Sequence, residues 1–85
     1  MEIDLHLTKE IISSPYFDPK DALNIQLGML EKGIDNAILA NSYEITIIHG
    51  VGEGVLKKEV QKILKKHPLI IEIKDDYGKT KAIFK

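Results

Sequence analysis

Hydrophobic and polar residues alternate along four short stretches of the chain. Residues 2–7 alternate strictly, which places three aliphatic side chains on one face and Glu, Asp and His on the other. Residues 69–75 and 80–85 alternate in the same way, and residues 44–48 form a short run rich in isoleucine. A period of two is typical of half-buried β-strands, so the sequence predicts four of them.

Apolar residues spaced three or four apart predict two helices. The first begins at Asp18, an acidic N-cap followed by a proline, and ends at Asn41. The second covers residues 55–66, and Pro68 prevents it from continuing. Residues 8–17 fit neither period, and we interpret them as an irregular connection.

The resulting order of elements, βαβαββ, predicts an α/β (α+β) fold. Helical crossovers make the first three strands parallel, and a short turn at residues 76–78 makes the last strand antiparallel. Because three of the strands have a polar face, both helices should cover the same side of the sheet. We therefore expect residues 1–85 to form a single domain, a two-layer sandwich with a mixed four-stranded sheet and one open sheet face.

Composition limits the classes of function. The 85 residues include no cysteine, which excludes a disulfide framework and a zinc site built from thiolates. No apolar run approaches the roughly 20 residues that span a bilayer. The N-terminus also lacks the basic start of a signal peptide, so a cytoplasmic protein without a membrane partner is expected. A chain of this size favours a shallow surface site over a deep pocket.

Charge is distributed unevenly, although the net charge is only −1. Residues 1–40 contain three lysines and seven acidic residues, whereas residues 41–85 contain nine lysines and six acidic residues. The chain has no arginine, the side chain that binds phosphate and guanine bidentately. Any DNA or RNA should therefore bind weakly, without sequence specificity and with a strong dependence on salt.

Asp4 and His6 are the first candidates for chemistry. Strand alternation places them side by side on a polar face, roughly 6–7 Å apart along the strand. A carboxylate next to an imidazole can orient the ring, fix its tautomer or share a metal ion with it. Two solvated polar residues on an open sheet face are the more common arrangement at this spacing.

The second candidate is the loop from His49 to Gly54, which connects a predicted strand to a predicted helix. The glycines Gly50, Gly52 and Gly54 allow backbone amides to approach an anion, and the N-terminus of the following helix favours the same charge. The spacing matches neither a P-loop nor a dinucleotide-binding fingerprint. Glu53 would compete with a phosphate, and the alternative is a tight turn in which Glu53 complements the helix dipole.

Lysines on the second predicted helix are the third candidate. Lys58, Lys62 and Lys65 form one stripe opposite the apolar positions, with Lys57 beside it. Such a stripe can neutralise phosphates, although a merely solvated helix face shows the same pattern more often than not.

Two of these segments together resemble a known family. Residues 3–6 and 48–57 are similar to the L-D-L-H and H-G-x-G motifs of the small MutS-related (Smr) domain, in the form seen in bacterial proteins. The resemblance covers nearly the whole chain and implies a fold similar to the C-terminal domain of translation initiation factor three. The chain departs from the family pattern in two places. Leu7 stands where many members have glycine, and residues 77–80 replace a glycine-rich stretch before the last strand.

The resemblance implies binding of DNA or RNA and, in several members of the family, an endonuclease, a hydrolase that nicks or cleaves strands. The catalytic residues would then be Asp4, His6 and His49. His49 would act as acid or base at the phosphate, while Asp4 would orient His6 or help to hold a divalent ion, magnesium or manganese. The residues expected to bind nucleic acid, through loop amides or lysine charge, are Gly50, Gly52, Gly54, Lys57, Lys58, Lys62 and Lys65.

Two other hypotheses stay open. One is a non-catalytic interaction domain, with a protein partner or as part of a longer chain, which the near-zero net charge and the altered residues 77–80 favour. The other is a metal site formed by Asp4, His6 and His49, whose side chains are suitable ligands. A shared site requires these three side chains to lie on one side of the sheet, near the carboxyl ends of its parallel strands.

Overall fold

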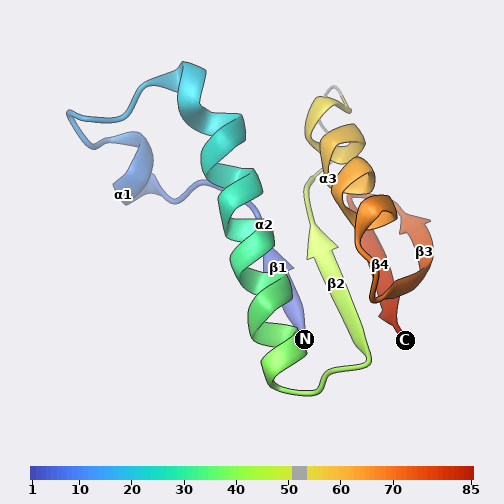
Figure 1. Cartoon of the computed structure of the whole chain (residues 1–85). Helices are drawn as coiled ribbons and strands as arrows, with labels where there is room; N and C mark the ends of the chain where they lie inside the picture. The colour runs from blue at the N-terminus through green and yellow to red at the C-terminus, as the bar shows by residue number, and fades with distance from the viewer. Residues whose placement is uncertain (51–53) are drawn as a thin grey trace.

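Four strands form one mixed sheet in the computed structural model, which describes residues 1–50 and 54–85 (Figure 1). The strands are β1 (Glu2–Asp4), β2 (Glu44–Ile48), β3 (Ile70–Asp76) and β4 (Lys79–Phe84). Their order across the sheet is β1-β2-β4-β3. β1 is parallel to β2, and β4 is antiparallel to both β2 and β3, so β1, β2 and β3 share one direction. The predicted strand directions are confirmed.

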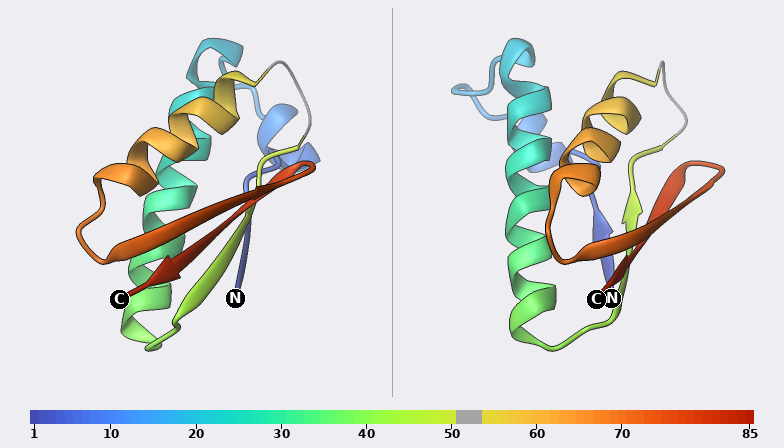
Figure 2. Two further views of the ribbon diagram at one scale, coloured as in Figure 1. Left: turned by 90° about the vertical axis from the view of Figure 1, so that its right-hand side faces the viewer. Right: turned by 45° about the vertical axis from the view of Figure 1, so that its right-hand side comes forward.

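Two long helices, α2 (Ala22–Leu39) and α3 (Val55–Lys66), cover one face of the sheet and leave the other face open (Figure 2). This confirms the predicted two-layer architecture. A 3-10 turn, η1 (Pro19–Asp21), precedes α2, and the Asp18 carboxylate caps it by accepting a hydrogen bond from the backbone N–H of Lys20 at 2.9 Å. Among the described residues, no helix is long and apolar enough to cross a membrane.

Residues 8–17 are more regular than the sequence predicted. Lys9–Ile12 form a short helix, α1, and the Thr8 hydroxyl caps it by accepting a hydrogen bond from the backbone N–H of Ile11 at 3.3 Å. The prediction of an irregular connection was therefore wrong for these four residues. The physical reason is that α1 buries none of its side chains. A helix without a buried face needs no apolar period, so the sequence pattern did not indicate it.

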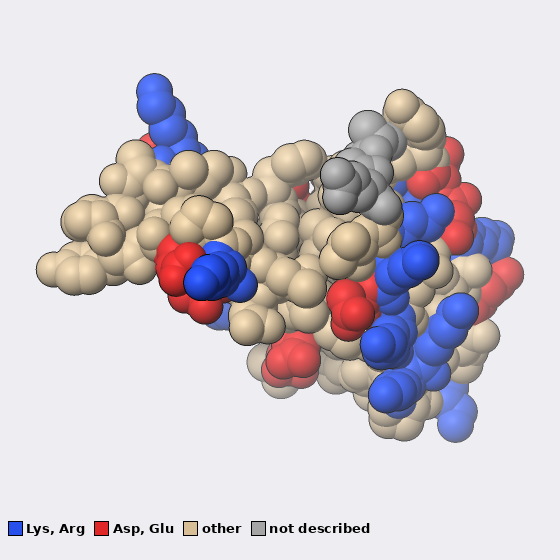
Figure 3. Space-filling model, turned by 90° about the horizontal axis from the view of Figure 1, so that it is seen from above, with Lys and Arg blue, Asp and Glu red and all other residues tan. Residues whose placement is uncertain are grey.

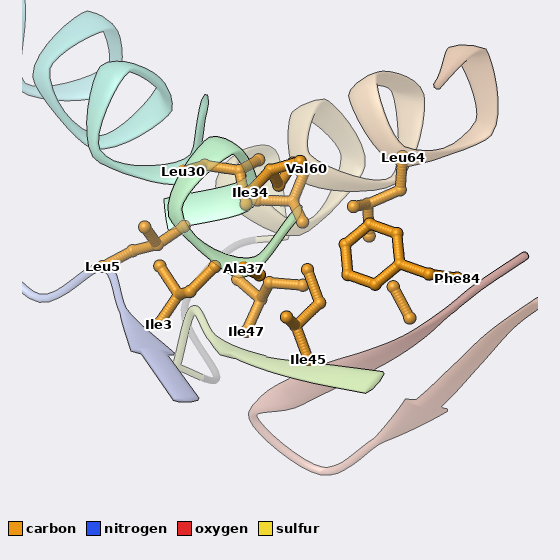
Figure 4. Packing of buried hydrophobic residues seen from close by; sticks show 11 residues of the cluster. Ile3, Leu5, Leu30, Ile34, Ala37, Ile45, Ile47, Val60, Leu64 and Phe84 are labelled. Atoms are coloured by element: carbon orange, nitrogen blue, oxygen red, sulfur yellow. The ribbon is translucent and has the colours of Figure 1, made fainter. Parts of the chain in front are cut away.

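The hydrophobic core fills the space between the two helices and the sheet (Figure 4). Close packing brings α2 onto β1 at Gly33, where a Cβ atom would lie only 2.6 Å from Cδ1 of Ile3. This contact holds β1, and the residues that follow it, against the helical layer. The buried side chains of the core are Ile3, Leu5, Leu30, Ile34, Ala37, Ile45, Ile47, Val60, Leu64, Ala82 and Phe84.

Candidate functional site

Asp4 and His6 form a hydrogen-bonded pair where the chain leaves β1. The Asp4 Oδ1 atom accepts the backbone N–H of His6 at 2.9 Å and lies 2.6 Å from His6 Nδ1. This local bonding competes with strand pairing, and β1 ends at Asp4 rather than continuing over residues 2–7 as predicted. The structure brings the two side chains into direct contact, and both are exposed, His6 to 65% and Asp4 to 60%.

The charge of the Asp4 carboxylate fixes the orientation of the His6 ring. The backbone hydrogen bond from His6, followed by the hydrogen bond from its side chain, holds the pKa of Asp4 below its ordinary value. An ionised carboxylate only accepts hydrogen bonds, so the Nδ1 atom of His6 carries the hydrogen. The other ring nitrogen, Nε2, is then the atom that can accept a proton from a ligand or donate one to it.

Gly50 lies against the His6 ring. A Cβ atom at Gly50 would lie 3.4 Å from His6 Nε2, within van der Waals contact. Gly50 also has a φ of 77°, a left-handed conformation that glycine adopts without strain. The first glycine of the predicted loop therefore places a backbone peptide beside the exposed imidazole.

His49 has a different environment, because it is buried, with only 8% of its surface exposed. It continues the inward-facing alternation of Ile45 and Ile47 in β2. Its Nδ1 atom is 2.9 Å from the carbonyl oxygen of Gly50, and its Nε2 atom is 2.9 Å from the hydroxyl of Thr80. Both ring nitrogens are therefore engaged within the protein.

The sheet separates His49 from the Asp4–His6 pair. Asp4 alternates with the buried Ile3 and Leu5 and so points to the open face, whereas His49 points toward the helices. The expectation that the three side chains share one side of the sheet is wrong. Asp4 pairs with Ile48, which faces the other side of the sheet from the buried Ile47 and His49, and the His6 ring is bonded to Asp4. Within residues 1–50 and 54–85, no three His, Asp or Glu side chains gather so that they could hold a metal ion, which gives the three-residue metal site no support.

Thr80 and Asp75 belong to this region, although the sequence patterns did not single them out. Thr80 is fully buried, and its hydroxyl lies 3.1 Å from Asp75 Oδ1, to which it can donate. A signal for Thr80 was present in the sequence. Thr80 is the polar residue among the three inward-facing positions of β4, and Ala82 and Phe84 occupy the other two.

The hairpin between β3 and β4 also contacts the glycine loop. Strand pairing leaves Tyr77 and Gly78 as a two-residue turn, in which Gly78 has a φ of 75°. The carbonyl oxygen of Gly78 accepts the backbone N–H groups of His49 at 3.1 Å and of Gly50 at 2.9 Å. The segment that departs from the family pattern, residues 77–80, thus holds the start of the glycine loop.

The middle of this loop, residues 51–53, lies outside the described residues. The binding role predicted for Gly52 and the competition expected from Glu53 both fall there. Gly54 directly precedes α3 with a φ of 87°, and a Cβ atom on it would meet nothing within 4 Å. Among the described residues, therefore, none fills the space beside the Cα atom of Gly54, and its binding role stays a prediction.

Lysines gather on the half of the molecule that carries α3, next to the glycine loop (Figure 3). Lys58 and Lys65 are exposed and make no ion pair with a described residue. Lys62 lies 3.5 Å from a glutamate one turn earlier, and Lys57 lies 3.8 Å from the carboxylate of Asp75. Of the four lysines predicted to bind nucleic acid, two thus have acidic partners and two make no ion pair with a described residue.

Comparison with known proteins identifies the family. The family model for the Smr domain matches residues 26–81, which is more than half of the chain. The crystal structure of the Smr domain of Thermus thermophilus MutS2 superimposes with a TM-score of 0.75 over 99% of this chain and 96% of that one, at 18% sequence identity, which shows a shared fold.

Curated relatives named "Endonuclease MutS2" match a shorter stretch. Those of Lactococcus lactis and of Geobacillus are 55% and 58% identical over 38 residues, or 45% of this chain. The match covers about 5% of the length of each relative. The family match and the shared fold agree with the resemblance of the two motifs, and the chain belongs to the Smr domain family.

Proposed function

We propose that this chain is a nucleic-acid-binding domain of the nuclease type, in which the Asp4–His6 pair meets a phosphodiester of DNA or RNA. The observation that carries the proposal is the geometry of this pair. His6 is exposed, the Asp4 carboxylate orients it, and its Nε2 atom lies beside the Gly50 backbone. The relatives named endonucleases support the class of ligand.

His6 is better placed than His49 for exchanging a proton with a bound phosphate group. A general acid or base must reach the reacting atom within hydrogen-bond distance, directly or through one water. The Nε2 atom of His6 is accessible to a phosphate, because the side chain is exposed and Nδ1 is held by Asp4. Both nitrogens of His49 are bonded inside the protein. The acid or base role that the sequence suggested for His49 therefore passes to His6 in this proposal.

Binding itself should be weak and electrostatic. Lys58, near the start of α3, and Lys65, in its last turn, supply exposed positive charge, while the acidic partners of Lys57 and Lys62 reduce what those two can offer to a phosphate. Lysine acts on phosphate as a point charge and reads no base sequence. We therefore expect binding to DNA or RNA without sequence preference, and a requirement for a divalent ion is left to experiment.

The test compares cleavage and affinity in one set of assays. Branched, duplex and single-stranded DNA and RNA are incubated with the protein in magnesium, manganese or EDTA, and binding is followed by gel mobility. His6→Ala should reduce cleavage by about 10²- to 10⁴-fold, the usual contribution of a general acid or base, while the fold and most of the affinity remain. His67→Ala is the control for the loss of an imidazole at the opposite end of α3 from the glycine loop, and its stability is measured alongside, because the His67 ring accepts the backbone N–H of Leu69 and packs against Phe84.

The outcomes separate the two main hypotheses. Cleavage that His6→Ala abolishes and His67→Ala preserves supports the nuclease hypothesis. Cleavage that persists in His6→Ala refutes the role assigned to the Asp4–His6 pair. If the unmutated protein binds none of the nucleic acids at low salt, the alternative of a non-catalytic interaction domain with a protein partner becomes the better one. The two-residue turn at Tyr77 and Gly78 shortens the neighbouring loop, so we expect any cleavage to be slow.

A further inference from the structure

A chain of hydrogen bonds crosses the molecule from α3 to the start of the glycine loop. The Gln61 side chain donates to Asp75 Oδ1, and the Thr80 hydroxyl lies 3.1 Å from the same oxygen. The Thr80 hydroxyl is also 2.9 Å from Nε2 of His49, whose Nδ1 atom is 2.9 Å from the carbonyl oxygen of Gly50. Four elements, α3, β3, β4 and the end of β2, are connected in this way.

Counting hydrogens assigns a hydrogen to the Nδ1 atom of the His49 ring. A carbonyl oxygen only accepts hydrogen bonds, so the Nδ1 atom facing Gly50 must carry a hydrogen. The Thr80 hydroxyl has a single hydrogen, which it donates either to Asp75 or to His49 Nε2. In the first case Nε2 donates to Thr80, and the ring, with a hydrogen on both nitrogens, is an imidazolium cation; in the second case Nε2 accepts, and the ring is neutral with its hydrogen on Nδ1. Nδ1–H points at the Gly50 carbonyl in both arrangements.

Because these groups are buried, losing one of these hydrogen bonds should cost stability. Thr80 is completely buried and His49 nearly so. Among the residues that the structure describes, every buried side-chain nitrogen or oxygen has a hydrogen-bond partner. Removing the Thr80 hydroxyl would leave Nε2 of His49 without a partner away from water, which is costly.

The chain of hydrogen bonds ends on the peptide against which His6 lies. The Gly50 carbonyl is held by His49, and the Gly50 N–H donates to the Gly78 carbonyl at 2.9 Å. Both polar groups of Gly50 are thereby fixed from inside the protein. His6 Nε2 approaches the same residue from the open side, 3.4 Å from where a Cβ atom would be.

We propose that Thr80 and Asp75 are positioning residues, which act through the His49 ring to hold the Gly50 peptide beside His6. His49 is then also a positioning residue. The consequence for nucleic-acid binding rests on the proposed function, whereas the effect on His49 and Gly50 does not. An experiment with two arms measures these two effects separately.

The first arm compares Thr80→Val with Thr80→Ser. Valine has nearly the volume of threonine but no hydroxyl, whereas serine keeps the hydroxyl and loses a methyl group. The readouts on uniformly ¹⁵N-labelled full chain are the imidazole ¹⁵N signals of His49 and the amide signal of Gly50. In the unmutated protein and in Thr80→Ser we expect a protonated Nδ1 and an unchanged Gly50 amide. In Thr80→Val both sets of signals should move.

A second variant keeps the proposal testable if Thr80→Val does not fold. Asp75 is 47% exposed, so Asp75→Ala removes the acceptor of the Thr80 hydroxyl without opening the core. The Thr80 hydroxyl then has only His49 Nε2 to donate to, so the Nε2 signal in Asp75→Ala should be that of an unprotonated nitrogen, whichever arrangement the unmutated protein has. Glu72→Ala is the matched control, because Glu72 lies on the same strand and pairs only with Lys74 among the described residues, at 3.9 Å.

Affinity for a single-stranded and a duplex DNA oligonucleotide forms the second arm. Thr80→Val should lose about five-fold in affinity, the equivalent of one ordinary hydrogen bond, and Thr80→Ser should restore it. If the His49 and Gly50 signals stay unchanged in Thr80→Val, or if Nε2 of His49 is protonated in Asp75→Ala, the positioning role is refuted. Those signals could also respond as expected while neither the unmutated protein nor the variants bind nucleic acid. In that case the positioning role stands and the proposed function is refuted.

Discussion

Gly28 and Gly33 lie inside the same helix, α2, yet alanine at these two positions should change stability in opposite directions. Alanine in the interior of a helix is favoured over glycine by about 1 kcal/mol. At Gly28 a Cβ atom would meet nothing within 4 Å. Gly28→Ala should therefore stabilise the protein by roughly that amount, since it gains helix propensity and displaces no neighbour.

At Gly33 the same Cβ atom would collide with β1. It would lie 2.6 Å from Cδ1, 2.8 Å from Cγ1 and 3.0 Å from Cγ2 of Ile3. The Cδ1 atom can rotate away, but the two γ carbons sit on a β-branched side chain with little rotational freedom in the core. Forcing extra volume into a packed core costs about 1–3 kcal/mol. This cost equals or exceeds the helix gain, so Gly33→Ala should be destabilising by up to about 2 kcal/mol.

Equilibrium unfolding in urea measures this difference directly. The two variants should move the unfolding midpoint in opposite directions with an unchanged dependence on denaturant, and a domain of this size shifts its Tm by about 4–8 °C per kcal/mol. Ile3→Val removes the closest atom, so the cost of Gly33→Ala should be smaller in that background. Equal stabilisation by both glycine substitutions would refute the close approach of α2 to β1, and with it the explanation of how β1 is held.

Two further predictions concern the charged residues. Replacing Lys58, Lys62 and Lys65 together by alanine should weaken binding equally for all sequences, and the slope of log affinity against log salt should decrease by roughly 0.9 for each phosphate of duplex DNA that a lysine no longer neutralises. A triple substitution of the lysines in the acidic half of the chain should leave the slope unchanged, and a slope that is flat in the unmutated protein would contradict the lysine mode. The pKa of Asp4 is lowered mainly by the backbone N–H of His6, so in His6→Ala an NMR titration of the carboxyl should show the pKa rising only in part. Because the folded-state pKa is below the unfolded one, the stability that this pair contributes should be present above the ordinary carboxyl pKa and be lost as pH falls through the lowered value.

The architecture could be predicted because burial leaves a periodic record in the sequence. Strands with one buried face alternate with a period of two, and helices with one buried stripe repeat every three or four residues. α1 escaped prediction because it buries nothing, and β1 was predicted too long because Asp4 satisfies the backbone N–H of His6 locally. Both errors concern segments whose conformation is set by side-chain hydrogen bonds rather than by packing.

The candidate site could be predicted less completely. Spacing and the family resemblance singled out Asp4, His6, His49 and Gly50 as candidates, but the sequence analysis did not use strand alternation to ask which face His49 occupies. Extending the alternation of β2 by one step, from Ile45 and Ile47 to His49, gives the inward orientation that the structure has. The contact of Thr80 with His49 was beyond such reasoning, because it joins residues 31 positions apart through the pairing of β2 with β4.

The opposite faces of His6 and His49 change how substitutions in the two motifs should be interpreted. His6 is exposed, and among the described residues its ring bonds only to Asp4, so its loss removes a group at the surface and should leave the fold intact. His49 is buried with both nitrogens bonded, so its loss leaves the Thr80 hydroxyl and the Gly50 carbonyl without these partners and should cost stability as well as binding. An inactive His49→Ala protein is therefore no evidence for catalysis by His49 unless its stability is measured alongside. An inactive His6→Ala protein that keeps its stability and its affinity for nucleic acid, in contrast, supports proton exchange at the phosphate.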